Sequence, residues 1–337
     1  MPLPEAPLAE RLFRVADGVY RIPLPTPYPV GDVNAYLVDG PRPVLIDTGV
    51  AGERAMDALA LALGALGRRV EDVRDVLLTH IHQDHAGNAD AIRLRAGATV
   101  RVAARAVPRL ADIRGTSDRE FPLLIAFLRR AGFGDHTIDT FVQSRHLVLA
   151  GSRSCPVSSP LADGDALDLG DGRRLSVHAR PGHSRNDLLF LLDGTGVAFT
   201  GDHVLEHITP NPTLDPPEPD DPRPYRALVT YQESLRATAE LPVDVAAPGH
   251  GAPFGELAAR CRTILAMQDR RIARTHRILA ERGPMSLKDL SRAMFGPVRD
   301  WDVFLTLSEA IGAVQALEAQ GRAERRPEDG VERVVAL

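Results

Sequence analysis

The sequence is poor in cysteine, lysine and aromatic residues. Two of its 337 residues are cysteines, Cys155 and Cys261, and they lie far apart in the chain. Such a pair excludes a disulfide-rich scaffold and a cysteine-based metal cluster, so we expect two free thiols in a reducing compartment. Lys288 is the only lysine. No basic stretch is interleaved with aromatic residues, which disfavours a surface for single-stranded nucleic acid.

Long hydrophobic runs and a large excess of charge are also missing. No segment approaches the roughly 20 consecutive apolar residues of a membrane span. The first 18 residues contain acidic side chains and no long apolar core, so they do not predict a secretory signal. The net charge of −5 predicts no general attraction to nucleic acid or to an anionic membrane. We therefore expect a cytoplasmic protein that does not bind membranes.

Short apolar segments alternate with helix-like segments through residues 1–255. Strands are predicted near 18–22, 34–38, 43–49, 75–78, 98–104, 165–169, 176–179, 188–192, 196–200 and 244–247. Helices are predicted near 54–66, 88–95 and 225–241. Residues 106–150 contain two apolar helical segments with no strand between them, which we interpret as a helical insertion. The pattern predicts a layered α/β domain.

The composition changes after about residue 256. An Arg-rich helix, a helix that Ser286 begins as N-cap, and an apolar helix near 304–319 are followed by two short strands around a PEDG turn. This order predicts a small winged-helix-like domain over residues 256–337. Its 14 basic and 12 acidic residues are too balanced for a strong phosphate-binding face.

The stretch LLTHIHQDHAGN (residues 77–88) concentrates metal-ligand residues directly after the predicted strand at 75–78. It contains His80, His82, Asp84 and His85. The carboxyl end of a strand is where α/β proteins usually carry their chemistry. Neutral imidazole and carboxylate are the ligands that suit zinc and neighbouring metals. A plain surface turn is the alternative that the stretch alone leaves open.

Three further residues of ligand type lie in equivalent settings. His183, Asp202 and His250 each follow a predicted strand and a tight glycine-containing turn, in ARPGHS, FTGDH and AAPGHG. Residues at the ends of adjacent strands converge in space even when they are distant in sequence. The sequence therefore predicts one metal centre built from several strand ends.

These motifs resemble those of the metallo-β-lactamase-fold superfamily. The matching residues are His80, His82, Asp84, His85, His183, Asp202 and His250, with LIDTG at 45–49 as the early signature. The resemblance covers about residues 15–255 and implies a four-layer αββα sandwich with a binuclear metal site at one edge of its two sheets. The order of modules, with the winged-helix-like domain last, is similar to that of the endoribonuclease-like lactamase-β-like proteins.

The resemblance also implies a role for each residue. His80, His82 and His183 would hold the first metal, and Asp84, His85 and His250 the second. Asp202 would bridge the two ions. Asp47 would hydrogen-bond a ligand imidazole and fix its tautomer. We expect two divalent ions, zinc as the default, although the same ligands accept manganese or iron.

The implied chemistry is nucleophilic hydrolysis by a hydroxide that bridges the two ions. Asp84 could also steer the nucleophile or accept its proton. His203 and His207, just after Asp202, are candidate proton donors to the leaving group; buried histidines bonded to backbone are the alternative. The proline-rich loop at 207–222 is expected to border the cleft.

The helical insertion is the main indication of the substrate. Its apolar residues are Phe121, Leu123, Leu124, Phe127, Leu128, Ile138, Phe141 and Val142. If this face lines the metal cleft, it favours an ester, thioester or lactone with a hydrophobic acyl group as small-molecule substrate. Ordinary packing of the insertion onto the sandwich is the alternative.

Two other functions remain open at the level of sequence. The order of modules suits a metal-dependent endoribonuclease, for which Arg270, Arg271, Arg274 and Arg277 could form a local patch, although a solvated helix face is the simpler interpretation. A metal-responsive winged-helix regulator is the non-enzymatic alternative, and both the balanced charge and the complete ligand set argue against it. The C-terminal domain could instead pack on the sandwich or mediate a homodimer.

Overall fold

The computed structural model describes residues 13–213, 225–298 and 302–337. The first 12 residues, on which the expectation of no secretory signal largely depends, lie outside this part of the chain, as do residues 214–222 of the predicted cleft loop.

The first sheet has six strands that follow one another in chain order. They are β1 (Phe13–Ala16), β2 (Val19–Leu24), β3 (Val33–Val38), β4 (Val44–Ile46), β5 (Asp75–Leu77) and β6 (Thr99–Arg101). Strands β1 to β4 pair antiparallel, whereas β4, β5 and β6 are parallel. The parallel connections run through α2 (Glu53–Ala65) with η1 (Val70–Asp72), and through α3 (Gln83–Ala86) with α4 (Ala89–Ala96).

The second sheet has five strands in the order β11-β10-β9-β8-β7. They are β7 (Ala166–Asp168), β8 (Arg174–Ala179), β9 (Leu188–Leu192), β10 (Val197–Gly201) and β11 (Val245–Pro248). Central strand β9, LLFLL, is buried along its whole length, as its uninterrupted apolar sequence requires. Helix α8 (Ala227–Ala239) connects the parallel pair β10 and β11, and α9 (Leu257–Arg282) follows.

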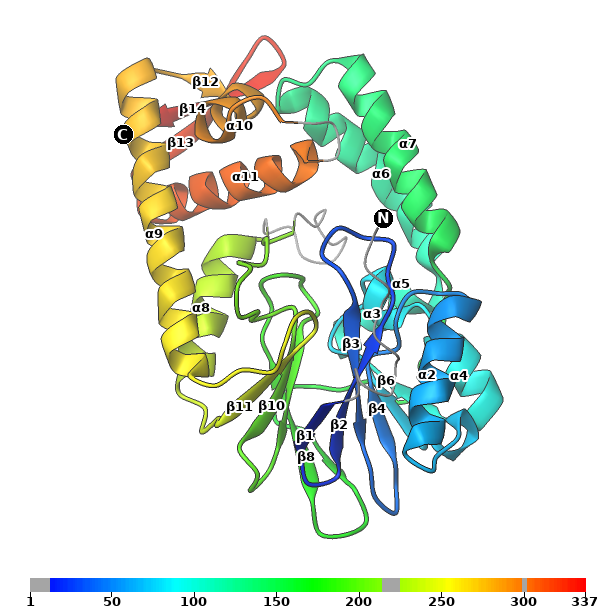
Figure 1. The fold of residues 1–337 in the computed structure, drawn as a ribbon. Helices are drawn as coiled ribbons and strands as arrows, with labels where there is room; N and C mark the ends of the chain where they lie inside the picture. Colours follow the sequence, from blue (N-terminus) through cyan, green and yellow to red (C-terminus); the bar gives the residue numbers. More distant parts are fainter. Residues whose placement is uncertain (1–12, 214–224, 299–301) are drawn as a thin grey trace, which may run out of the picture.

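The two sheets face each other, and helices cover their outer sides. Figure 1 shows α2 and α4 outside the first sheet and α8 and α9 outside the second. One apolar core fills the space between the sheets, and the rings of Tyr36 and Phe199 meet across it at 5.3 Å. Burying each such side chain contributes about 1.5–3 kcal/mol. The expected αββα sandwich is therefore confirmed.

The insertion and the C-terminal residues form the remaining elements. After η2 (Ala104–Ala106), the insertion holds α5 (Val107–Ala111), α6 (Ile113–Arg130) and α7 (Asp135–Gly151). Residues 256–337, which we call the C-terminal module, hold α9, β12 (Met285–Ser286), α10 (Leu287–Phe295), α11 (Val303–Ala319), β13 (Ala323–Glu328) and β14 (Val331–Ala336). Ser286 caps α10 by accepting from the Asp289 amide at 3.1 Å. The helices and hairpin occur in the predicted order; the winged-helix assignment and the division at residue 255 stay predictions.

The insertion packs against the C-terminal module rather than standing free. Leu128, Ala131 and Ile138 share one buried cluster with residues of α10 and α11. The Lys288 amide also donates to the Ala131 carbonyl at 3.0 Å. In Figure 1, α6 and α7 rise beside the same end of the sandwich over which α11 lies. Two segments distant in sequence thus form one apolar body.

Within the part of the chain that the structure describes, no helix combines the length and apolarity of a membrane span. The expected cytoplasmic location stays a prediction. Both cysteines are free and buried, as expected from their isolation in the sequence. Burial raises the pKa of the Cys155 thiol to about 11 and that of Cys261 to about 12.

We predict that neither thiol reacts readily with a thiol reagent in the folded protein. With a pKa of about 11, roughly one Cys155 thiol in a thousand is ionised near pH 8, and burial blocks access to it. Both cysteines should react fully after unfolding in urea. Fast labelling of either cysteine in the native protein, measured by mass spectrometry, would contradict their placement in the core.

Candidate metal centre

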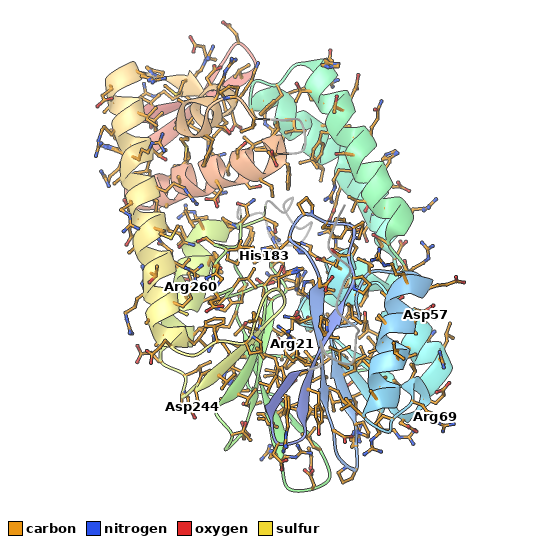
Figure 2. All side chains as sticks on the ribbon, viewed as in Figure 1. Arg21, Asp57, Arg69, His183, Asp244 and Arg260 are labelled. Carbon is orange, nitrogen blue, oxygen red and sulfur yellow. The ribbon has the colours of Figure 1, made fainter. Side chains whose placement is uncertain are left out.

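The predicted ligands come from four chain segments that end at the same edge of the two sheets. His80 and His82 follow β5, and Asp84 and His85 lie in the short helix α3. His183 follows β8, Asp202 follows β10, and His250 follows β11. Figure 2 places His183 at the end of the sandwich that faces α11. The structure brings all seven predicted side chains together.

The first group of ligand atoms consists of three imidazole nitrogens. His80 Nε2 lies 2.9 Å from His82 Nδ1, and His183 Nε2 lies 3.1 Å from the same atom. Nitrogen ligands on a tetrahedral zinc ion lie about 3.3 Å apart. The separations are therefore close to those of one metal ion bound by all three rings.

The second group consists of Asp84, His85 and His250. Asp84 Oδ2 lies 3.3 Å from His250 Nε2 and 3.9 Å from His85 Nε2. Asp202 lies between the two groups, because its carboxylate is 3.8 Å from His183 Nε2, 3.5 Å from His85 Nε2 and 3.7 Å from His250 Nε2. This is the arrangement expected of a bridging carboxylate.

Four of the five histidines are held by a bond to the ring nitrogen that faces away from the centre. The partners of Nδ1 are Thr79 Oγ1 for His80, the Asp47 carboxylate for His85, the Asn211 carbonyl for His183 and the Asp32 carbonyl for His250. Each distance lies between 2.8 and 3.1 Å. An acceptor on Nδ1 keeps the proton there and leaves Nε2 as a free lone pair, which is the form that binds metal.

Asp47 orients more than one residue of the centre. Its carboxylate accepts from His85 Nδ1, from the Thr79 amide and from Thr79 Oγ1, each at 2.8 Å. The residue is 2% exposed and has a backbone φ of 60°, a conformation that Asp and Asn tolerate better than other non-glycine residues. The hydrogen bond that the LIDTG motif implied is thus present, and it ties His85 to the segment that carries His80.

Burial and neighbouring charge set the protonation of the centre. Burial, reinforced by His183, lowers the pKa of His82 to about 3, and burial also lowers the pKa of His80 far below its usual range. Burial opposes charge on His85, yet the carboxylates, Asp202 foremost, raise its pKa well above normal. The reverse holds for Asp202, whose pKa His85 lowers despite burial.

Some of the ligand atoms have no hydrogen-bond partner in the protein, as expected of atoms that bind a metal ion. His85 Nε2 and Asp202 Oδ1 are buried and have no hydrogen-bond partner among the described residues. Such atoms are costly unless something neutralises them. Two groups of nitrogen and oxygen ligands around a shared carboxylate meet the requirements of two divalent cations.

Gly249 makes the close packing of this edge feasible. A Cβ atom at this position would overlap Asp202 Oδ1 and lie 2.6 Å from His85 Cε1. The glycine before His250 in APGHG therefore leaves room for the side chains of Asp202 and His85, and any larger residue at position 249 would collide with them.

The two candidate proton donors lie outside the clusters of ligand atoms. His203 is buried with Nε2 at 2.9 Å from Thr238 Oγ1, and burial lowers its pKa to about 3. His207 is exposed, with Nε2 at 3.1 Å from Glu206. His203 is thus buried as the alternative held, but its ring contacts a side-chain hydroxyl rather than backbone, and His207 lies at the surface instead of being buried. Neither contact directs a proton toward the centre.

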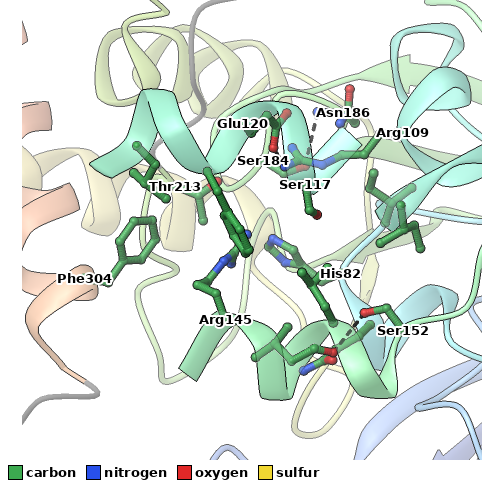
Figure 3. A pocket seen from close by; sticks show the side chains of 17 residues that line it. His82, Arg109, Ser117, Glu120, Arg145, Ser152, Ser184, Asn186, Thr213 and Phe304 are labelled. Carbon is green, nitrogen blue, oxygen red and sulfur yellow. Dashed lines mark hydrogen bonds and ion pairs between the residues drawn. The ribbon is translucent and has the colours of Figure 1, made fainter. Parts of the chain in front are cut away.

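A cavity of about 150 Å³ adjoins the centre at His82. Figure 3 shows His82, Arg145 and Phe304 among its walls. Its apolar lining consists of Ile81, Ile113, Phe121, Leu124, Val148, Leu149 and Phe304. Its polar lining consists of His82, Gln83, Arg109, Ser117, Glu120, Arg145, Ser152, Ser184, Asn186 and Thr213.

The apolar face of the insertion is thus divided between two environments. Phe121 and Leu124 line the cavity, whereas Leu128 and Ile138 are buried against the C-terminal module and Leu123 is 52% exposed. Phe127, Phe141 and Val142 pack on that same buried cluster. The alternative, in which these residues pack onto the sandwich, is wrong for most of them, because they pack against the C-terminal module. Thr213 shows that the loop after residue 207 reaches the cavity.

Comparison with known proteins agrees with this geometry. The sequence profile described as "Metallo-beta-lactamase superfamily" matches residues 28–250. A "Probable metallo-hydrolase YqjP" of Bacillus subtilis is 30% identical over 308 residues, covering 90% of this chain and 93% of the relative. The chain therefore belongs to the metallo-beta-lactamase superfamily, and it is a metal-dependent hydrolase of that family.

Two further similarities extend the comparison. The crystal structure of a metallo-beta-lactamase family protein from Thermus thermophilus has a TM-score of 0.80 and 26% identity, covering 96% of this chain and all of the other. The shared fold thus includes the insertion and most of the C-terminal module. An "Atrochrysone carboxyl ACP thioesterase" of Aspergillus terreus is 30% identical over 148 residues, 41% of this chain and 42% of the relative.

Several residues of the centre could not be recognised from sequence. Thr79 precedes the motif without a distinguishing pattern, and the contributions of Asp32 and Asn211 are backbone carbonyls. A carbonyl group has no residue-specific signal. Arg145 and Phe304 reach the cavity through tertiary packing, for which the only signal was the apolar character of their helices.

We predict that Asp47→Asn weakens metal binding by about 10–100-fold, because His85 and Thr79 lose a charged acceptor while the backbone conformation remains accessible to Asn. Competition with a chromophoric chelator measures the affinity directly. Asp57→Asn, at an exposed position of α2, is the matched control. Unchanged affinity in Asp47→Asn would refute the orienting role of this carboxylate.

Proposed function

We propose that this protein hydrolyses an ester, thioester or lactone that carries a hydrophobic acyl group, using two divalent metal ions. The observation that carries the proposal is the cavity beside His82, whose apolar wall is built by the insertion. Seven of the 17 lining residues are apolar, and an apolar wall combined with placed polar groups is typical of a small-molecule site. The thioesterase name of the Aspergillus terreus relative supports an acyl substrate.

Seven residues would act as metal ligands, and one of them, Asp84, would also accept a proton. His80, His82 and His183 would hold one ion; Asp84, His85 and His250 would hold the other; Asp202 would contact both. When bound, the ions lower the pKa of a water molecule and polarise the oxygen of the bond under attack. We propose zinc as the metal, with manganese and iron as alternatives that the same ligands accept.

Asp84 is the side chain we propose as catalytic in addition to its ligand role. Burial opposes its charge, but His85 and the bond to His250 outweigh burial and lower its pKa. The carboxylate is therefore ionised at neutral pH. We propose that it accepts the proton that the attacking water loses.

The cavity would position the acyl group. Phe121 and Leu124 present apolar surface next to His82, so an acyl chain lying against them has its carbonyl near the first group of ligands. Arg109 and Glu120 form an ion pair in the same wall. The pair neutralises its own charge, and Arg145 is a further cationic side chain of the lining.

The contacts of the C-terminal module argue against RNA as the substrate. Four of its arginines pair with glutamates: Arg271 with Glu309, Arg325 with Glu318, Arg326 with Glu324 and Arg333 with Glu328. Paired arginines release few counterions on binding a nucleic acid. Of the proposed Arg patch, Arg271 is turned inward, whereas Arg270, Arg274 and Arg277 lie on the solvent side of α9.

We predict turnover of acyl thioesters, esters or lactones by zinc- or manganese-loaded protein, and no cleavage of single-stranded RNA. Asp84→Asn should reduce acyl turnover by at least about a hundredfold, since it removes a ligand charge and a proton acceptor. Asp57→Asn should match the wild type. RNA cleavage that depends on Asp84, without acyl turnover, would replace this proposal with the endoribonuclease.

A further inference from the structure

The first turn of α11 reaches the substrate cavity although it belongs to the C-terminal module. Phe304 lines the cavity together with His82, Phe121 and Leu124. Figure 3 shows the Phe304 ring at one side of the cavity, across from Arg109 and Asn186. A residue far in sequence from every proposed metal ligand therefore forms part of the wall of the cavity beside His82.

Phe304 is supported from behind by the insertion. Its ring stacks on Phe141 of α7, with centroids 5.3 Å apart and an interplanar angle of 27°. Phe141 packs on the apolar cluster of the C-terminal module and is not among the residues that line the cavity. The stack holds the Phe304 ring between a half-buried neighbour on one side and the cavity on the other.

The same turn of α11 is tied to the metal centre. The Leu305 carbonyl accepts from Asn211 Nδ2 at 3.3 Å, and the Asn211 carbonyl accepts from His183 Nδ1 at 2.9 Å. Thr213, which also lines the cavity, donates its hydroxyl to the His183 carbonyl at 2.7 Å. One short loop thus connects the beginning of α11 to the proposed ligand His183. These hydrogen bonds hold the cavity wall at a defined distance from the metal centre.

We propose that Phe304 is a specificity-determining residue and that the C-terminal module completes the acyl site. The inference rests on the function proposed above. The ring limits the length of acyl group that the cavity accepts, because aromatic carbon occupies space that a longer chain would need. The module then acts in substrate selection, in place of the nucleic-acid role that its order in the chain suggested.

The test compares three variants on straight-chain acyl thioesters of short, medium and long chain. Phe304→Ala should raise the ratio of kcat/KM for long over short chains by about tenfold, and Phe304→Trp should lower it. Phe141→Ala removes the support of the Phe304 ring but keeps the ring itself in the cavity wall, so its ratio should shift in the same direction as in Phe304→Ala and by less. Binding of non-hydrolysable thioether analogues, measured by calorimetry, should shift in the same directions.

The outcomes separate the two proposals. If the wild-type protein hydrolyses acyl substrates but both Phe304 variants keep its chain-length ratio, or Phe304→Ala shifts it no more than Phe141→Ala does, the role of Phe304 is wrong and the proposed function stands. If the wild-type protein hydrolyses no acyl substrate, the proposed function fails and the role of Phe304 fails with it. Opposite shifts in the Ala and Trp variants support specificity, because damage to the fold would move both in one direction.

Discussion

The proton on the outward nitrogen of each oriented histidine is the constraint on which the centre depends. His80, His85, His183 and His250 each have Nδ1 bonded to a hydroxyl, a carboxylate or a backbone carbonyl. Their Nε2 atoms consequently face one another and two carboxylates in a buried space, an arrangement that suits a bound cation. The acceptors come from both sheets and their loops, so the sandwich must close correctly before the ligands can converge.

The proposed metal ligands and the cavity wall belong to different parts of the protein. The ligands lie on strand ends and short turns of the sandwich, whereas the cavity wall comes mainly from the insertion and from one turn of α11. Because insertion and C-terminal module share an apolar cluster, they form a single support for that wall. Under the proposed function, substitutions there would change the accepted acyl group while the hydrogen bonds that orient the histidines stay intact.

The sequence was most informative where a side chain and its local pattern coincide. The alternating strands, the helices of the insertion, the Ser286 cap and all seven converging residues were predictable, because period, capping and ligand spacing are local properties. The short strands β1 and β12 were missed, since two to four residues carry too little pattern. The packing of the insertion on the C-terminal module, the Asn211 and Asp32 carbonyls and the position of Phe304 depend on tertiary contacts that no local pattern records.

The most direct test of the central claim is a crystal structure of the zinc-loaded protein with anomalous diffraction recorded on both sides of the zinc absorption edge. The account predicts two zinc peaks, one among His80, His82 and His183 and one among Asp84, His85 and His250, with Asp202 in contact with both. A single peak, or a peak that His85 does not contact, would contradict the binuclear centre and the orienting role of Asp47.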